Sequence, residues 1–501
     1  MRRAASSRTQ ACLIAAALIP ALSLGACTVG PDYFSAAAPT PTKYKELKGW
    51  KLATPSDGPG SGDWWAFYHD RRLNELIKQV EISNQTVAAQ AAAYEQARAV
   101  VREAQAALFP TISGSYAATR NYTGPKALGS GTVLPVGAGG LYTTTYVPQF
   151  SGSWDLDIWG KVRRQIESNT SAAQASAADL AYAKLSQQAM LATAYFNLRA
   201  ADSLRDLLER TVVEYKKTLD IVQNQYKSGY SVTLGDVAAA RAQVEITQAQ
   251  AINVGVQRAQ SEHAIAILVG RPPAELTIGP HPLAGGIPKI PVAVPSTLLE
   301  RRPDIAAAER TMQQQNALIG VAVAGYFPDI TLSGLLGWSS AITPLPLNVA
   351  NAVWSLGATG TETLFNGGLT AALVDAARAA YWQSVADYRQ TVLTAFQGVE
   401  DELVAIRLMT KSLAVQQQAV KDARTAVDVY LNQFKAGTVA YTTVVTAQIT
   451  LLADEEAELT IRQDLFLASV TLIEDLGGGW DKRLLPTKKE MVKNFSLLPQ
   501  L

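Results

Sequence analysis

Cysteine and histidine are scarce in this chain of 501 residues, which contains two cysteines and three histidines. Cys12 lies in an N-terminal segment that we expect to be removed, so the mature chain keeps one thiol and cannot form an internal disulfide. His69, His263 and His281 are far apart and do not have the spacing of zinc ligands. The sequence therefore predicts no disulfide-rich scaffold, no metal site and no other cofactor.

Excess charge and a long apolar run are missing as well. Lys and Arg number 44, and Asp and Glu number 43, so the net charge is +1 and gives no reason to expect a nucleic acid as a partner. The clearest apolar stretch, residues 11–22, is shorter than the roughly 20 residues that a membrane-spanning helix needs.

No group of residues has the pattern of a catalytic site. Glu400, Asp401 and Glu402 are adjacent, and successive residues of a helix point in different directions, which favours a solvated or interhelical patch. The stretch GAGG at 137–140 is not followed by the Lys-Ser/Thr pair of a phosphate-binding loop, and we expect a surface loop there. The sequence predicts that the protein is not an enzyme.

The first residues have the pattern of a bacterial lipoprotein signal. Arg2 and Arg3 precede the short apolar run, and the stretch LGAC, which ends at Cys27, resembles a lipobox. We expect residues 1–26 to be removed and Cys27 to be acylated, while an ordinary secretory signal with a chance cysteine is the alternative. Thr28 follows the cysteine, and by resemblance to lipoprotein sorting rules the absence of Asp there favours the outer membrane.

An internal duplication is visible in two similar stretches, ALFPTISGSY at 107–116 and GYFPDITLSG at 325–334. In each, a helical run ends in Phe-Pro, and an alternation of polar and apolar residues with a period of two begins. A spacing of 208 positions separates Gly160 from Gly368 and also Gly229 from Gly437. Each half therefore predicts the order helix, strand, strand, long helix, helix.

The duplication divides the mature chain into segments. Residues 27–62 are rich in Pro, Gly and Ser and are expected to form a lipidated, extended tether, and residues 481–501 a C-terminal tail. The first repeat is expected at 63–295, with strands at about 111–123 and 142–157 and a long helix at about 160–228. The second is expected at 296–480, with strands at about 329–340 and 352–364 and a long helix at about 367–436 that is broken only by Gly398. The expected helix–strand junctions are Pro110, Gly160, Pro328, Gly367 and Gly368.

The predicted strands have one apolar and one Ser/Thr-rich face, a pattern in which a membrane barrel turns the apolar face to lipid and the polar face to water. Four strands cannot close a barrel, and unpaired backbone groups in lipid cost several kcal/mol each. Two copies would give eight strands and a filled interior, whereas three would give twelve strands and room for a pore. Glu362 belongs to the apolar series of its strand, and we expect it near the periplasmic rim.

The predicted fold is therefore mainly α with a transmembrane β part. The long helices would each span roughly 100 Å and continue the barrel as an α-helical cylinder across the periplasm.

Several stretches resemble one family. They are CTVGPDY, WWAFYHDRRLNELI, SWDLDIWGKVRRQIE, LFNGGL and, as the most specific, RRPDIAAAE through YFPDITLSG. The chain resembles the TolC-like outer-membrane factors, in the NodT-type lipoprotein branch that serves resistance–nodulation–division efflux pumps. The resemblance implies a homotrimer with a shared twelve-stranded barrel in outer-membrane lipid. It also implies a periplasmic adaptor protein and an inner-membrane resistance–nodulation–division pump as partners.

The resemblance also implies roles for two groups of residues. The turns that would meet the adaptor contain Ser228, Gly229, Tyr230, Ala436, Gly437 and Thr438, although the glycines fit simple helix caps equally well. In TolC-like channels an aspartate pair follows the second tip by six and nine residues and narrows the entrance. Thr443 and Thr446 occupy those positions here, and Asp236 in the first repeat is the candidate to replace part of the acidic ring.

Two other functions remain open at this point. A type I secretion channel for proteins would have the same architecture, and the identity of a neighbouring pump gene would decide. A periplasmic coiled-coil scaffold that does not conduct would lack the amphipathic strands, and conductance in planar bilayers would separate it from a channel.

Overall fold

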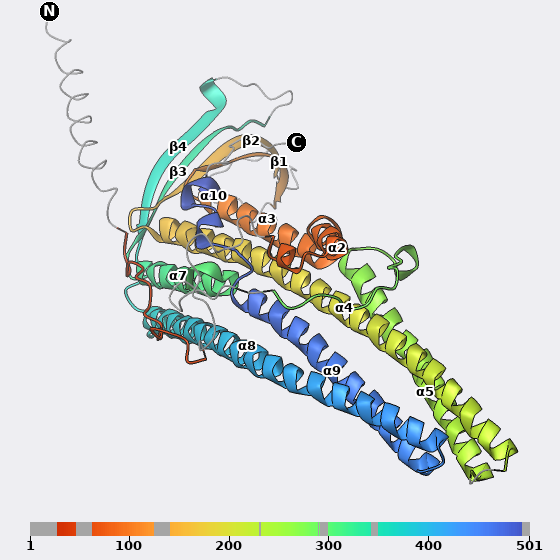
Figure 1. The fold of residues 1–501 in the computed structure, drawn as a ribbon. Coiled ribbons are helices and arrows are strands. Elements are labelled where there is room, and N and C mark those ends of the chain that lie inside the picture. The colour runs from red at the N-terminus through yellow and green to blue at the C-terminus, as the bar shows by residue number, and fades with distance from the viewer. Residues whose placement is uncertain are drawn as a thin grey trace, which may run out of the picture.

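The computed structural model describes residues 28–46, 63–124, 141–229, 232–288, 290, 299–341 and 349–492. The expected signal peptide, Cys27, Tyr230 and the stretch 137–140 lie outside the described residues. The described part is elongated, with a four-stranded sheet at one end and long helices that extend from it to two tips at the other end (Figure 1).

The two halves of the chain contain the same series of elements. The first half has α3 (Gln85–Ala106), β1 (Thr111–Thr123), β2 (Leu141–Leu156), α4 (Lys161–Lys227) and α5 (Leu234–Leu268). The second half has α7 (Pro303–Ala324), β3 (Asp329–Trp338), β4 (Ala352–Thr361), α8 (Leu369–Lys435) and α9 (Tyr441–Asp475). The shorter elements are η2 (Trp64–Tyr68), α2 (Arg71–Ser83), η4 (Pro273–Glu275), η5 (Val349–Asn351), η6 (Lys482–Leu484) and α10 (Lys488–Val492).

Corresponding helices of the two halves have equal lengths, which confirms the internal duplication. The lengths are 22 residues for α3 and α7, 67 for α4 and α8, and 35 for α5 and α9. At 1.5 Å per residue, each 67-residue helix is about 100 Å long.

Local contacts and backbone conformation fix the connections from β2 into α4 and from β4 into α8. Gly160 and Gly368, the residues before α4 and α8, have φ of 82° and 89°, a left-handed conformation that other residues adopt at a cost. The carboxylate of Asp157 accepts hydrogen bonds from the backbone N–H groups of Val162 and Arg163 at 2.9 and 3.0 Å. These bonds satisfy donors of the first turn that have no partner within the helix.

The junctions of the two halves lie against each other. Pro110 and Pro328 stand directly before β1 and β3. The ring of Trp159 stacks on Phe327 with centroids 4.8 Å apart, and its indole Nε1 donates to the carbonyl oxygen of Pro328 at 2.9 Å. The sheet is therefore attached to the helical body through contacts that join the two repeats.

The strands form one antiparallel sheet in the order β1-β2-β3-β4, and its register separates two chemically different faces. The apolar face contains Ile112, Tyr116, Tyr122, Tyr142, Tyr146, Phe150, Trp154, Leu156, Ile330, Leu332, Leu336, Trp354 and Leu356. The opposite face contains Thr111, Ser113, Ser115, Thr119, Thr143, Thr145, Gln149, Ser151, Ser153, Thr331, Ser333, Ser355 and Thr359. Strand β4 ends at Thr361, so Glu362 lies just beyond the strand. The expectation that Glu362 belongs to the apolar series of the strand is therefore wrong.

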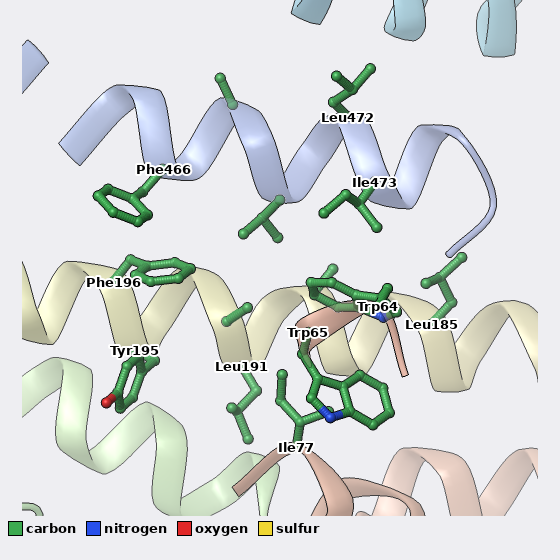
Figure 2. Close-up of a cluster of buried hydrophobic side chains, with 14 of the residues drawn as sticks. Trp64, Trp65, Ile77, Leu185, Leu191, Tyr195, Phe196, Phe466, Leu472 and Ile473 are labelled. Carbon is green, nitrogen blue, oxygen red and sulfur yellow. The ribbon is translucent and has the colours of Figure 1, made fainter. Parts of the chain in front are cut away.

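The largest hydrophobic core lies in the helical body, where α4 and α9 pack together over η2 and α2 (Figure 2). Trp64 and Trp65 of η2 are buried in it, and the rings of Phe196 and Phe466 are 4.8 Å apart. Burial contributes about 1.5–3 kcal/mol for each large apolar side chain. Because α4 belongs to the first repeat and α9 to the second, this core holds the two halves together.

The described N-terminal segment 28–46 is extended, and it is packed on the helical body. The guanidinium of Arg164 donates to the carbonyl oxygens of Val29 and Gly30 at 3.1 and 3.3 Å and pairs with Asp32 at 3.0 Å. A Cβ atom at Gly30 would lie 2.4 Å from the Cα atom of Gly320, so the segment crosses α7 in backbone contact.

The same segment is held again on α8. The carboxylate of Glu400 accepts hydrogen bonds from the backbone N–H groups of Lys45 and Glu46 at 2.6 and 2.9 Å, and Arg407 pairs with the side chain of Glu46. Tyr44 is 2% exposed and lies edge-on to Phe396. The segment thus links α4, α7 and α8 on the outside of the body.

Gly398 does not break α8, because the helix is continuous from Leu369 to Lys435. A Cβ atom at Gly398 would lie 2.5 Å from Oδ2 of Asp475 at the end of α9. The same carboxylate accepts a hydrogen bond from Nη1 of Arg302 at 2.9 Å. Gly398 therefore gives Asp475 the space in which to pair with Arg302, a tertiary role that the residue type alone does not reveal.

The Gly398→Ala substitution should destabilise the protein, because the added methyl group displaces the Asp475 carboxylate from Arg302. Overpacking of this kind costs about 1–3 kcal/mol. Gly255→Ala in α5 is the matched control, since nothing lies within 4 Å of its Cβ position and the change should stabilise the helix by about 0.5–1 kcal/mol. Apparent melting temperatures of the purified variants measure both effects. Equal melting temperatures would disprove the role of Gly398.

Candidate functional site

The first part of the candidate site is the pair of helical tips. Gly229 and Gly437 follow α4 and α8 with φ of 77° and 75°, and the backbone N–H of Thr438 donates to the carbonyl oxygen of Gln433 at 3.0 Å. At the end of α8 this bond, together with the one from the Gly437 N–H to the carbonyl oxygen of Phe434 at 3.0 Å, forms a Schellman cap. No atom lies within 4 Å of a Cβ position at either glycine, so within the described chain the positive φ, and not crowding, requires glycine there. The cap interpretation of these glycines is therefore supported.

The neighbouring tip residues are open to solvent. Ser228, Ala436 and Thr438 are exposed, as are the two glycines. The hydroxyl groups of Ser228 and Thr438 donate to carbonyl oxygens of their own helix ends, Asn224 at 2.8 Å and Gln433 at 3.0 Å. At these described tip positions the side chains are therefore small or absent, and the backbone is open to solvent.

A small hydrophobic core, which we call the tip core, joins the helical hairpins α4–α5 and α8–α9 close to their turns. It consists of Val222, Val237, Ala240, Phe434, Tyr441 and Val444, which come from α4, α5, α8 and α9. The rings of Phe434 and Tyr441 are 5.7 Å apart, and the side-chain amide of Gln225 donates to the carbonyl oxygen of Phe434 at 3.3 Å. The two tips are therefore one packed unit in this structure.

A buried polar link lies further along the same helices. The hydroxyl of Tyr215 donates to the carbonyl oxygen of Gln448 at 3.0 Å, and the Gln448 amide donates to the hydroxyl of Thr218 at 3.0 Å. Thr218 and Gln448 are each no more than 5% exposed, so these groups would be costly to leave unpaired. The link fixes α9 against α4.

The three gate candidates lie near the start of α5 and α9. Asp236 accepts hydrogen bonds from the backbone N–H and the hydroxyl of Thr233 at 2.8 Å each, which makes it part of a capping box. Its charge also contributes, after burial, to raising the pKa of Tyr441 to about 12. Thr443 is half-buried, and the hydroxyl of Thr446 donates to the carbonyl oxygen of Thr442 at 2.8 Å. Asp236 thus has a structural use on its own helix whatever else it does.

The second part of the candidate site is the two-faced sheet at the opposite end. Its edge strands β1 and β4 each expose one row of backbone N–H and C=O groups that no strand of the described chain pairs. At the helical end of the apolar face, the indole of Trp154 donates to the carbonyl oxygen of Leu108 at 3.0 Å. At the far end, the rings of Tyr122 and Tyr142 are 4.8 Å apart. The apolar face thus has aromatic residues at both ends.

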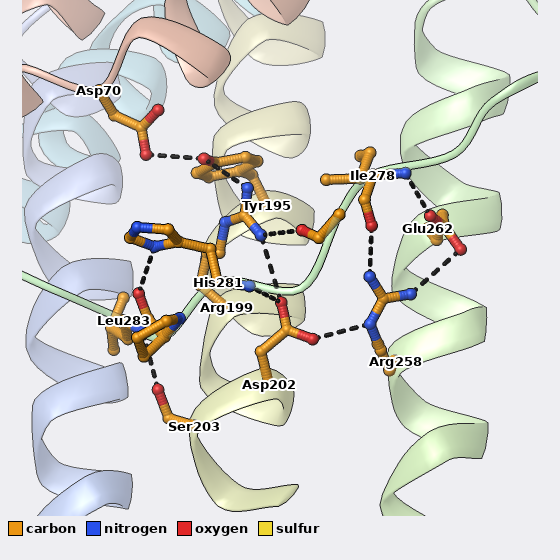
Figure 3. A network of polar contacts seen from close by, with 12 residues as sticks. Asp70, Tyr195, Arg199, Asp202, Ser203, Arg258, Glu262, Ile278, His281 and Leu283 are labelled. Atoms are coloured by element: carbon orange, nitrogen blue, oxygen red, sulfur yellow. Dashed lines mark hydrogen bonds and ion pairs between the residues drawn. The ribbon is translucent and has the colours of Figure 1, made fainter. Parts of the chain in front are cut away.

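A buried polar network between the tips and the sheet could not be found from the sequence (Figure 3). Tyr195 donates to the carboxylate of Asp70 at 2.6 Å and accepts from Arg199 at 3.0 Å, and Arg199 pairs with Asp202 at 3.2 Å. Arg258 of α5 pairs with the other oxygen of Asp202 at 2.7 Å. The network joins α2, α4 and α5, and no periodicity or motif marks its members.

The carboxylates 400–402 do not form a common site. Glu400 binds the N-terminal segment, as described above. Burial, together with the charges of Asp475 and Asp401, raises the pKa of Glu402 to about 7. Burial raises the pKa of Asp475 and of Glu474 as well.

No group of three or more His, Cys, Asp or Glu residues that could hold a metal ion occurs in the described part of the chain. Among the described helices, none combines the length and apolarity needed to span a membrane.

Comparisons with known proteins identify the fold. The solved structure of the outer-membrane channel OprN superposes with a TM-score of 0.82 at 27% identity and covers 91% of this chain and 100% of that one. The pyoverdine export outer membrane protein OpmQ of Pseudomonas aeruginosa is 28% identical over 467 residues, which cover 92% of this chain and 95% of OpmQ. The cation efflux system protein CusC of Escherichia coli O6:H1 is 26% identical over 466 residues, 92% of this chain and 98% of CusC.

The duplicated fold with its four-stranded sheet is therefore that of a TolC-like outer-membrane channel subunit. The family model described as outer membrane efflux protein matches residues 76–271 and 294–478, one match in each half, and the chain belongs to this family. Membership confirms the resemblance to efflux channels of the NodT type and the prediction that the protein is not an enzyme.

The raised pKa of Glu402 predicts that stability falls as pH rises. Between its ordinary value of 4.5 and about 7, the folded protein binds this proton more tightly than the unfolded chain, so the free energy of unfolding decreases across that window. Glu402→Gln should therefore raise the apparent melting temperature at pH 8 and change it little at pH 4.5. Part of the pH dependence will remain because Glu474 and Asp475 shift in the same direction.

Glu75→Gln is the matched control for Glu402→Gln. Hydrogen bonds from Arg71 and Arg72 lower the pKa of Glu75, so its neutralisation should not stabilise the protein at pH 8. Melting curves of the two variants from pH 4.5 to pH 8 provide the comparison. A parallel response of both variants would show that Glu402 is not responsible.

Proposed function

We propose that three copies of this chain form the outer-membrane channel of a tripartite efflux pump and conduct drugs or other small toxic compounds to the outside. The observation behind the proposal is the sheet, which is apolar on one face, polar on the other and unpaired at both edges. Three copies would supply twelve strands, pair all the edges and leave room for a pore.

The helices support the same assembly. They extend away from the sheet to the tips, and α4 and α8 are each about 100 Å long, enough to carry the passage across the periplasm. In the proposed complex the exposed tips meet a periplasmic adaptor protein, and the adaptor connects the channel to an inner-membrane resistance–nodulation–division pump. The small residues at the turns allow close approach of adaptor helices.

The proposed cargo is a class of compounds, small toxic molecules, and not one particular compound. OpmQ is named for pyoverdine export and CusC for cation efflux, so two relatives of similar identity to this chain are assigned cargoes of different chemistry. An open tube selects weakly, so we assign the choice of compound to the inner-membrane pump. A type I secretion channel for proteins is the alternative with the same architecture.

The location is proposed to be the outer membrane, with acylated Cys27 as an additional anchor. Residues 28–30 support this placement, because they pack beside the strand–helix junction at Gly160 and the backbone N–H of Val29 donates to the carbonyl oxygen of Trp159 at 3.0 Å. The anchor would therefore enter the membrane next to the base of the barrel.

The channel proposal predicts a conducting trimer. Detergent-purified protein should show the mass of three chains in native mass spectrometry and should give single-channel steps in planar bilayers. A monodisperse monomer, or a trimer that never conducts, would contradict the proposal and favour a scaffold.

The gate proposal concerns Thr443 and Thr446. Without carboxylates at these positions, trivalent cations should block the pore weakly from the periplasmic side. Asp at both positions should strengthen the block, because each trimer would gain six negative charges near its entrance. Current through single channels with and without a trivalent cation measures the effect. Strong block of the wild type that Asp236→Asn relieves would assign the acidic ring to Asp236 instead.

The tip proposal predicts that Thr438→Trp abolishes drug resistance with normal trimer yield and conductance, because the exposed indole keeps the adaptor away. Gly437→Ala is the contrasting change. It leaves the surface small but forces alanine into positive φ, at a cost of roughly 1–2 kcal/mol, so it should lower stability first. Drug susceptibility of cells and melting temperatures separate the two. Full resistance with Thr438→Trp would place the adaptor contact elsewhere.

A further inference from the structure

Arg120 stands out on the sheet because it is charged and belongs to the apolar face. In β1 it falls in the series Ile112, Tyr116 and Tyr122, four positions after Tyr116 and two before Tyr122, so all four side chains share one face. Its guanidinium carbon lies 5.1 Å from the ring centroid of Tyr142, which is the register partner of Tyr122. Arg120 therefore points to the same side of the sheet as the tyrosines.

The other charged residues of the described strands, Asp155 and Asp329, cannot neutralise Arg120. They belong to the polar face and lie at the helical end, where Asp155 accepts a hydrogen bond from Thr331 at 2.6 Å and Asp329 pairs with Lys161 at 3.6 Å. Arg120 itself is exposed and forms no ion pair with a described residue.

The amino-acid sequence supplies no other carboxylate at this end of the sheet. Residues 111–154 contain Arg120 and one lysine but no Asp or Glu, and residues 330–361 contain no charged residue of either sign. A counterion for Arg120 must therefore come from outside the sheet and its two connecting loops.

The position of Arg120 along the strand suggests where that counterion lies. Arg120 is nine residues beyond Thr111, or about 30 Å along the strand, and a tilt of roughly 40° reduces this to about 23 Å of height. The apolar band of a membrane barrel is about 25 Å tall. If the sheet crosses the membrane with its helical end in the periplasm, Arg120 lies at the outer edge of the band beside Tyr122 and Tyr142, where headgroups begin.

We propose that Arg120 binds a phosphate group of the anionic lipid of the outer leaflet, with Tyr142 holding the guanidinium at the interface. An arginine presents a planar fork of donors that matches a phosphate, and it stacks on aromatic rings at the same time. A trimer would have three such sites, one on each protomer. The inference rests on the proposed function, because it requires this sheet to lie in the outer membrane.

The experiment measures lipid bound to the full-length, detergent-purified trimer by native mass spectrometry. The probes are lipid A with its phosphates, the same lipid without phosphates, and inorganic phosphate alone. The wild type should bind phosphorylated lipid A at up to three per trimer and discriminate against the dephosphorylated form. Arg120→Gln should bind it about tenfold more weakly, and Arg120→Lys should keep more of the affinity than Arg120→Gln.

Arg71→Gln is the matched control, since Arg71 is 94% exposed on α2 and lies in the helical body. It should leave lipid binding unchanged. Equal binding by the wild type and Arg120→Gln, or equal binding of lipid A with and without phosphates, would overturn the inference. Inorganic phosphate that competes as well as the lipid would also overturn it, because the site would then not depend on a membrane component.

Conductance in planar bilayers distinguishes this inference from the proposed function. Arg120→Gln should conduct as the wild type does, since its side chain is on the face turned away from the pore. A conducting wild type without phosphate-dependent lipid binding would refute the lipid site and leave the channel intact. A wild type that neither forms a trimer nor conducts would refute the channel and, with it, the membrane position of Arg120.

Discussion

The unpaired edges of the four-stranded sheet are the constraint on which the rest of this structure depends. Each edge strand presents a row of backbone donors and acceptors, and in hydrocarbon each unpaired group costs several kcal/mol. The long helices extend away from the sheet (Figure 1), and the described part of the chain leaves Tyr116, Trp354 and Leu356 of the apolar face exposed. A single chain is therefore incomplete in a membrane, and edge pairing with further copies removes the cost without any change of fold.

Edge pairing between copies requires that every sheet leave its helices at the same angle. Several contacts near the junctions fix that angle. Trp159 packs on Phe327 and bonds to Pro328, Asp157 caps α4, and the left-handed glycines 160 and 368 turn the chain into the long helices. The N-terminal segment adds a further brace, because it is held by Arg164 at one end and by Glu400 at the other.

Most of the fold could be predicted because its signals are local. The change of period after Pro110 and Pro328, and glycines at helix ends, mark elements within a few residues. What could not be predicted depends on contacts between distant residues. Gly398 resembles a helix break until Asp475 is seen beside it, and the members of the network around Asp202 come from three separate segments. For the candidate site, the positive φ of Gly229 and Gly437 follows from their place after a helix, whereas the tip core joins four helices that no motif connects.

The two repeats keep the same geometry but use different chemistry at their tips. The start of α5 is stabilised by a capping box, in which Thr233 and Asp236 exchange hydrogen bonds. This cap is local and polar. The start of α9 has no side-chain cap; Ala440 precedes it, and Tyr441 is instead buried against Phe434 in the tip core. One hairpin therefore ends in a cap that is complete by itself, and the other depends on packing against its neighbours. Because corresponding helices have equal lengths, the two tips lie at the same distance from the sheet. The duplication thus preserves the helix geometry that assembly requires, although the residues that stabilise the two tips differ.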